Sequence, residues 1–203
     1  PAPLDVDGAL LTTAEALASA LKRVLGDEQN ELLERLRTLR RGAAADAPEV
    51  LGDAGELTQR FAAVAAGPLG DLADRAMASL APDHRARPPA PGPMATAVAT
   101  ELVAPLHERL ARGFAESGTD AAEASVRARA TFREWKTQRI GALAADAARS
   151  AYHAGLLAGV AKGRALAWAP EDDDACPECG DNALAGPVAR GARYPTGHRH
   201  PPA

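Results

Sequence analysis

The residues best suited to chemistry lie near the carboxyl end of the chain. Cys176 and Cys179 are its two cysteines, and their two-residue spacing lets both sulfurs reach one tetrahedral metal ion. His198 and His200 follow about twenty residues later, a separation typical of the second half of a zinc site. These four residues predict a bound zinc ion. The alternative, two thiols without metal and two exposed histidines, stays open.

Two other uses of this cysteine pair are less favoured. The cysteines are too close in sequence for an ordinary structural disulfide. A redox role requires a thiol at the amino end of a helix, and the sequence indicates no strand and following helix around Cys176.

No arrangement of catalytic residues stands out elsewhere. His84, His107 and His153 are far apart in sequence, and neither a nucleophile elbow nor a glycine-rich phosphate loop is present. Asp146, Arg149 and His153 share one helical face, which we interpret as an ion pair beside a polar histidine. We therefore expect a protein that is not an enzyme and has no small-molecule substrate.

Composition limits the partners. With 27 acidic and 23 basic residues, the net charge of -4 gives no general attraction to nucleic acid or to an anionic membrane. No apolar run reaches the roughly 18 residues that span a bilayer. Apolar residues form 46% of the chain but aromatic ones only 3%, so Ala and Leu must supply most of the core. We expect closely packed helices and no membrane contact.

Helical patterns dominate the first part of the chain. The capping box at residues 12–15 predicts a helix start at Thr12, and its leucine stripe continues beyond Gly26-Asp27 as one kinked helix or two. Gly67-Pro68 is expected to separate two shorter helices. Five prolines between Pro82 and Pro93 predict a linker.

The second part continues the helical pattern. A helix is expected from Met94 to Ser117, bent or restarted by Pro105. A turn and cap at residues 117–120 should open a long Ala-rich helix that runs to about Lys162, with a break near Gly141 left open. The small residues of its later face, Ala147, Ala151 and Ala154, are expected to bind a protein partner.

The helical periodicity ends at Trp168, after which few large apolar groups remain to order the chain. We therefore predict an all-α fold, an elongated helical body with a small irregular or β-containing, zinc-ribbon-like C-terminal tail. The expected parts are an N-terminal helical region (1–82), a Pro-rich linker (83–93), a long-helix region (94–165) and the tail (166–203).

The tail carries a family resemblance in the order of its residues. After the Ala-rich helix come Trp168, the acidic run Asp172-Asp173-Asp174, Cys176-Pro177-Glu178-Cys179, and Tyr194-Pro195-Thr196-Gly197-His198 leading into Pro201-Pro202. This order resembles the Mu F-like minor head proteins of tailed bacteriophages, over roughly residues 140 to 203. In that family a His-Pro-x-Cys-Arg-Cys segment follows. The chain stops at Ala203, so we expect a longer polypeptide with further zinc ligands beyond it.

The resemblance implies a structural component of head assembly, associated with the portal and with capsid or scaffold proteins. It places the protein in the virion, and in the host cytoplasm during assembly. Two alternatives stay open. One is a zinc-stabilised nucleic-acid-binding module in which Arg190, Arg193 and Arg199 contact phosphate; the other is the delivery part of a phage-associated toxin.

Overall fold

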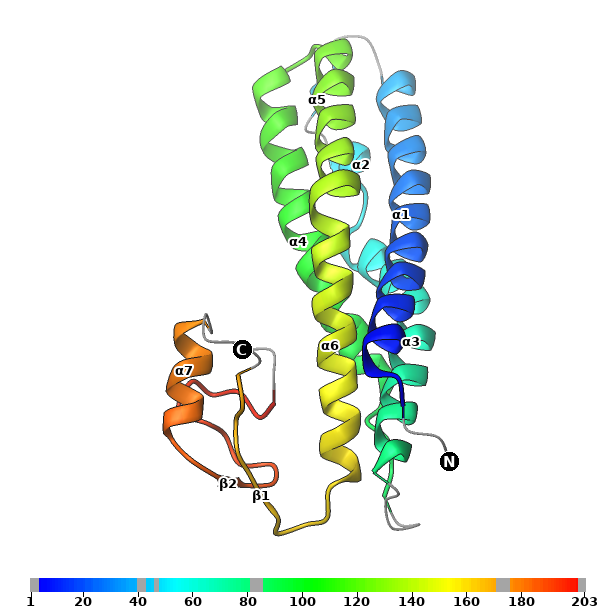
Figure 1. Ribbon diagram of the computed structural model, residues 1–203. Helices are drawn as coiled ribbons and strands as arrows, with labels where there is room; N and C mark the ends of the chain where they lie inside the picture. Colours follow the sequence, from blue (N-terminus) through cyan, green and yellow to red (C-terminus); the bar gives the residue numbers. More distant parts are fainter. Residues whose placement is uncertain (1–3, 40–42, 46–47, 81–85, 171–175, 201–203) are drawn as a thin grey trace. The chain divides into compact units, whose positions relative to one another are not determined.

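The computed structural model describes residues 4–39, 43–45, 48–80, 86–170 and 176–200. These residues are mostly helical and include one two-stranded sheet, so the predicted all-α class is confirmed. Along the chain (Figure 1) the elements are α1 (Val6–Thr38), α2 (Pro48–Leu51), α3 (Ala54–Ser79), α4 (Pro91–Ser117), α5 (Ala121–Glu134), the π-helical η1 (Trp135–Arg139), α6 (Ile140–Gly159), β1 (Ala165–Leu166), α7 (Pro177–Leu184) and β2 (Val188–Ala189).

Helix α1 begins at Val6, about two turns before the predicted start at Thr12, and continues without interruption through Gly26-Asp27. Its cap is Asp5, whose carboxylate accepts the Gly8 amide at 3.1 Å. The predicted start is therefore wrong. Because the upstream Asp5 satisfies the free amides, the later capping box lies inside the helix, and Thr13 is buried there.

Two proline positions also differ from expectation. Helix α3 passes through Gly67-Pro68 as one helix, where two were predicted. Helix α4 begins at Pro91 instead of Met94 and contains Pro105. A proline in the first helical turn costs little, because the amide it lacks would have no partner in the helix. Of the predicted linker, residues 83–85 lie outside the described residues, 86–90 have no regular secondary structure, and 91–93 belong to α4.

The helix after residue 120 follows the prediction more closely. Asp120 caps α5 and accepts the amides of Ala122 and Glu123 at 2.9 and 3.0 Å, as the turn at residues 117–120 predicted. Residues 121–159 then form an almost continuous helical run, interrupted by η1 rather than at Gly141. Helices α4 and α5 lie side by side and antiparallel (Figure 1).

The chain divides into two compact units. Unit 1 contains residues 1–13, 69–90 and 146–203; unit 2 contains residues 14–68 and 91–145. The core of unit 2 consists of leucines and alanines around a few aromatic side chains, among them the fully buried Phe61, Phe114 and Phe132.

In unit 1, α6 packs directly on α3 through small residues. A Cβ atom on Gly155 would overlap the Ala73 carbonyl oxygen, and one on Gly159 would lie 3.0 Å from the Met77 carbonyl oxygen. Gly155 therefore permits a backbone approach that no larger residue allows, and at Gly159 a side chain would make a tight contact. Ala147 and Ala151 are buried within the chain. For these two residues the expectation of a partner-binding face is wrong, because the chain itself covers them, whereas Ala154, the third residue of that face, is half-buried.

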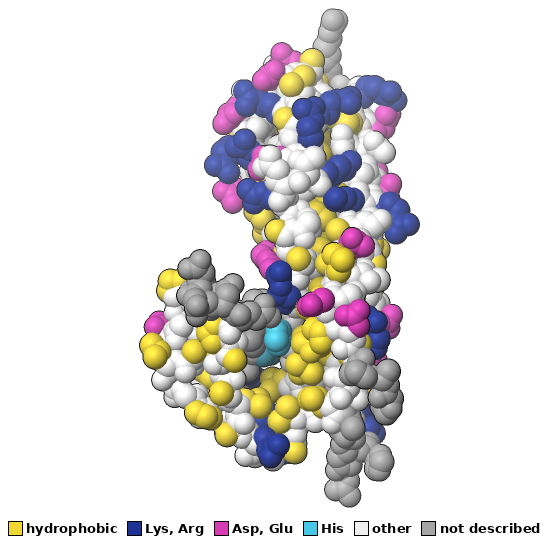
Figure 2. Space-filling view, in the orientation of Figure 1, with side chains coloured by type: hydrophobic (Ala, Val, Ile, Leu, Met, Phe, Trp, Pro, Cys, Tyr) yellow, Lys and Arg dark blue, Asp and Glu magenta, His cyan; other side chains and the backbone are white. Residues whose placement is uncertain are grey.

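Several charges on the surface of unit 2 form ion pairs. Figure 2 shows basic and acidic side chains interspersed over the end of this unit where α4 meets α5. The ion pairs of these two helices include Arg127 with Glu123 at 2.8 Å and Arg112 with Glu108 at 3.5 Å, each one helical turn apart. Exposed pairs of this kind stabilise the fold only weakly. Within the described residues, no helix combines the length and apolar character needed to cross a membrane.

Candidate functional site in the C-terminal tail

The tail folds around a short antiparallel ladder. Ala165 pairs with Ala189 and Leu166 with Val188, and the Arg190 amide extends the ladder by donating to the Arg164 carbonyl at 2.8 Å. The segment between the strands holds α7. This small sheet brings residues more than twenty positions apart in sequence next to one another.

Two aromatic residues form the apolar centre of the tail. The rings of Trp168 and Tyr194 meet edge to face, with centroids 5.0 Å apart, and both side chains are buried. The Tyr194 hydroxyl donates to the Leu166 carbonyl at 2.6 Å. Burial raises the pKa of the Tyr194 phenol above its ordinary value. Trp168 and Tyr194 are both among the residues that carry the family resemblance.

A chain of hydrogen bonds crosses the tail beside this pair. Asn182 is fully buried, and its side-chain oxygen accepts the Thr196 amide at 3.3 Å and the Thr196 hydroxyl at 2.9 Å. The same hydroxyl lies 2.9 Å from Nδ1 of His198. Since the Thr196 proton points to Asn182, the hydroxyl oxygen must accept from His198, so Nδ1 carries the hydrogen. In the neutral ring this leaves the lone pair on Nε2, the form in which histidine binds a metal.

The loop that carries Thr196 is held by its backbone. The Tyr194 amide donates to the His198 carbonyl at 2.9 Å, and the Gly197 amide donates to the Tyr194 carbonyl at 2.8 Å. Gly197 has a φ of 90°, which residues with a side chain rarely adopt. The aromatic-Pro-Thr-Gly-His motif is therefore a closed turn that presents the His198 ring.

Cys176 is the cap of α7. Its sulfur accepts the Cys179 amide at 3.2 Å, and Pro177 occupies the first turn. A helix therefore does follow Cys176, and the expectation that none is there, which weighed against a redox role, is wrong. Both cysteines are reduced thiols and are not joined in a disulfide, with Cys176 exposed and Cys179 half-buried.

The four predicted metal ligands do not meet as one set. Among the described residues, no three His, Cys, Asp or Glu side chains gather in a way that could hold a metal ion. Cys176 and Cys179 share the first turn of α7, whereas His198 belongs to the Thr196 turn and His200 lines a groove next to α6. The two sulfurs alone are too few to make a tetrahedral zinc site.

Two of the arginines expected to contact phosphate are engaged with the backbone. Arg190 donates to the carbonyls of Leu157 and Ala158 at 2.8 and 3.1 Å, and Arg193 donates to the Gly197 carbonyl at 2.8 Å. Arg190 thereby satisfies carbonyls at the carboxyl end of α6, where a positive charge is favoured. Arg190 thus connects the tail to α6, and Arg193 closes the turn at Gly197.

The helical trio that we interpreted as an ion pair has that geometry. Arg149 contacts Asp146 at 2.7 Å, both side chains are more than half exposed, and the His153 ring lies edge to face with Tyr152 at 5.3 Å. An exposed pair of this kind contributes little to stability.

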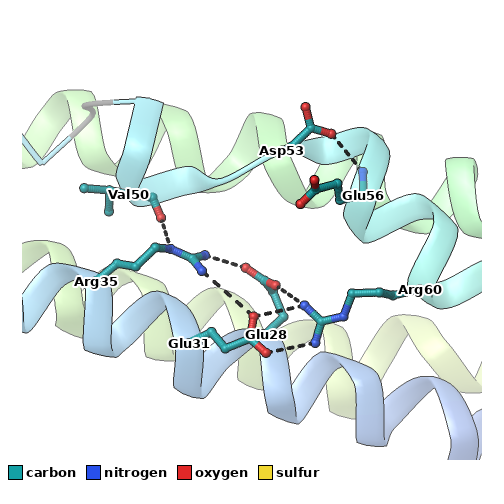
Figure 3. Close-up of polar contacts among 7 residues, drawn as sticks. All are labelled: Glu28, Glu31, Arg35, Val50, Asp53, Glu56 and Arg60. Atoms are coloured by element: carbon teal, nitrogen blue, oxygen red, sulfur yellow. Dashed lines mark hydrogen bonds and ion pairs between the residues drawn. The ribbon is translucent and has the colours of Figure 1, made fainter.

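A buried ion network in unit 2 was not anticipated. Glu28 is almost fully buried, and its carboxylate contacts Arg35 at 2.6 Å and Arg60 at 3.0 Å (Figure 3). Arg35 also donates to the Val50 carbonyl at 2.8 Å, while Arg60 contacts Glu31 at 3.0 Å. Burial lowers the pKa of Arg60, but the hydrogen bond and charge of Glu31, with smaller effects of Glu28 and Asp27, raise it overall. The network ties α1 to α3 and to the segment around α2.

The π-helical turn η1 was also missed. It buries Trp135, whose indole nitrogen donates to the Leu102 carbonyl of α4 at 3.3 Å, and the Arg139 guanidinium lies 4.3 Å from the indole ring centre. The four-residue spacing of Trp135 and Arg139 within a predicted helix was the sequence signal for the contact between these two side chains. A π-helical turn itself leaves no mark in hydrophobic periodicity.

Comparison of the chain with protein-family models, with curated proteins and with solved structures finds no match. The resemblance to the Mu F-like proteins therefore depends on the ordered tail residues alone.

Proposed function

We propose that the chain is a structural component of a tailed-bacteriophage head, of the Mu F-like minor head protein type, associated with the portal or the procapsid. Its place is the virion, and the host cytoplasm during assembly. The role is one of docking and not of catalysis, and the partners are portal, capsid or scaffold proteins.

One observation carries this proposal. Trp168 and the Tyr194-to-His198 motif carry the resemblance from two separate points of the sequence, and the rings of Trp168 and Tyr194 pack against each other in one small fold. Two segments that matched a pattern by chance would have no reason to share a centre. Together with the all-α body, this supports a folded C-terminal tail of the kind that the resemblance implies.

Zinc belongs to the same proposal. Cys176 and Cys179 supply two sulfurs on one helical turn, and the Thr196 hydrogen bond leaves Nε2 of His198 able to accept. The described residues do not assemble a third ligand beside the sulfurs. A zinc site on these sulfurs would thus need further ligands that the described residues do not bring together, and zinc would order the loops between β1 and β2.

Zinc content tests that part directly. The protein, purified without chelator, should contain about one zinc ion per chain by atomic emission, and Cys176→Ser should abolish it because one ligand is lost. The control is Leu184→Ala, which changes an exposed residue of the same helix, leaves both sulfurs in place and should retain metal. A protein without zinc whose tail is nevertheless folded would contradict the zinc part alone.

Particle association tests the function. The chain is co-expressed with the portal, scaffold and major capsid proteins of the tailed phage whose genome encodes it, and particles are separated on a sucrose gradient. We expect the chain to sediment with procapsids in few copies. Trp168→Ala, which removes half of the aromatic centre, should release it, while the exposed Glu34→Ala should not. A chain that stays at the top of the gradient beside intact procapsids and portals would overturn the proposal.

A further inference from the structure

Unit 1 contains an open groove of about 610 Å³ along the carboxyl-terminal part of α6. Its floor is apolar and includes Ala154, Leu157 and Ala158, all half-buried. Its rim comes from the turn after α6 and from the end of the tail, and includes Lys162, Arg199 and His200. An apolar floor beneath a basic rim is the character of a surface that binds another molecule.

The charges at this groove have one sign. Lys162 and Arg199 are exposed, and neither has an ion pair or hydrogen bond within the described part of the chain. Arg190 also lines the groove, with its guanidinium held on the α6 carbonyls at 2.8 and 3.1 Å. No Asp or Glu is among the described lining residues. The described lining of the groove is therefore positively charged, in a chain that is acidic overall.

Three arginines elsewhere on the chain, Arg35, Arg60 and Arg127, each contact two carboxylates. Lys162 and Arg199 have no such contact among the described residues. Such a basic rim favours a partner that carries negative charge.

The apolar floor and the basic rim together indicate which kind of molecule the groove binds. A phosphate backbone would satisfy the rim but has no apolar group for Ala154, Leu157 and Ala158, whereas an amphipathic peptide satisfies both. We propose that this groove binds an acidic, amphipathic segment of a partner protein, with its apolar side chains on the α6 floor and its carboxylates at Lys162 and Arg199. This inference rests on the proposed function only for the identity of the partner, which would be a protein of the phage particle. The chemistry of the groove does not depend on the proposed function.

Peptide selection tests the chemistry without knowledge of the partner. A yeast-displayed library of random 12-residue peptides is selected on the purified chain and, in parallel, on the double variant Lys162→Glu/Arg199→Glu. Both positions are exposed, so the variant should fold, which circular dichroism checks. Peptides enriched only by the unmodified chain should combine Asp or Glu with Leu, Ile, Val or Phe, and should bind the double variant at least about tenfold more weakly.

A matched control separates the groove from net charge. Arg109→Glu/Arg133→Glu makes the same charge change at two exposed arginines of unit 2 and should leave the selected peptides' affinity unchanged. A floor variant, Ala154→Glu, should weaken binding as the rim variant does.

The outcomes are distinct. No enrichment over the double variant, or enrichment of basic peptides, overturns the inference. Binding of a 20-base-pair DNA duplex that falls steeply with salt and is lost in the double variant, without peptide enrichment, would overturn it in favour of nucleic acid. The selection uses no phage particles, so its failure is separate from a failure of the chain to join procapsids.

Discussion

At the scale of single residues, the buried carboxylate of Glu28 has the greatest consequence. It faces two guanidinium groups that keep about a third of their surface in water, with exposed fractions of 30% for Arg35 and 38% for Arg60. Removing one member of such a network leaves the others partly buried without compensation, and this costs more than the intact ion pairs contribute.

Glu28→Ala should therefore lower the free energy of unfolding by about 2 kcal/mol, less than for a fully dry pair because water reaches the arginines. Urea unfolding followed by circular dichroism at 222 nm measures the change. The control on the same helix is Glu34→Ala, whose pair with Arg37 is mostly exposed and should cost at most about 0.5 kcal/mol. Equal losses in the two variants would show that burial of the Glu28 network contributes nothing special.

Tyr194 gives a prediction about pH. Burial raises the pKa of its phenol in the folded state, so the neutral form is the one that folding favours. The associated stability is fully present below pH about 10 and is lost as the pH rises through the folded pKa. Tyr152 is the only other tyrosine, and its pKa is also raised by burial.

Spectrophotometric titration at 295 nm of the Tyr152→Phe variant isolates Tyr194. Its midpoint should lie above the one measured in 6 M guanidinium chloride, where the phenol is hydrated. Coincident midpoints in the native and denatured protein would mean that Tyr194 is not held in the tail as described.

At the scale of elements, the contact of α6 with α3 depends on the absence of side chains. Gly155 leaves space for the Ala73 carbonyl, so any Cβ there must push the two helices apart. Gly141, near the start of α6, has nothing within 4 Å of the corresponding position. The same substitution at these two sites separates packing from helix propensity.

Gly155→Ala should destabilise the protein by about 1–3 kcal/mol through overpacking, whereas Gly141→Ala should stabilise it by about 0.5–1 kcal/mol because alanine favours the helical backbone. Thermal unfolding of both variants provides the comparison. Stabilisation by both substitutions would exclude the close approach of α6 to α3.

At the scale of the whole molecule, the helical class was predictable because alanines and leucines recur at helical spacing throughout residues 17–158. Local sequence signals for a helix end were misleading where a buried apolar stripe continued past them. Gly67-Pro68 does not end α3, because the buried stripe of Phe61, Leu69 and Leu72 continues across it.

The centre of the tail was predictable only in part. The Cys-x-x-Cys spacing and the Tyr-Pro-Thr-Gly-His turn drew attention to residues that indeed belong to one small fold. The fully buried Asn182 and its bond to Thr196 were not foreseen, since nothing local distinguishes that asparagine from an exposed one. The structural role of Asn182 depends on its contact with Thr196, fourteen positions later in the sequence.

The two tryptophans allow the last prediction, because Trp135 lies in unit 2 and Trp168 in the tail of unit 1. Trp135 is surrounded by the leucine-rich core of unit 2, whereas the buried hydrophobic residues among the described part of the tail are Trp168 and Tyr194. Less apolar surface leaves the metal-free tail less able to offset its ordering entropy.

In urea without metal, Trp168 fluorescence in the Trp135→Phe variant should therefore change at a lower concentration than the helical signal at 222 nm, by about 1 M for a difference of about 2 kcal/mol. Trp135 fluorescence in the Trp168→Phe variant should coincide with the helical signal, which serves as the internal reference in both proteins. If both fluorescence transitions coincide with the loss of helix, the tail unfolds together with the helices and its small aromatic centre is not the weakest part of the molecule.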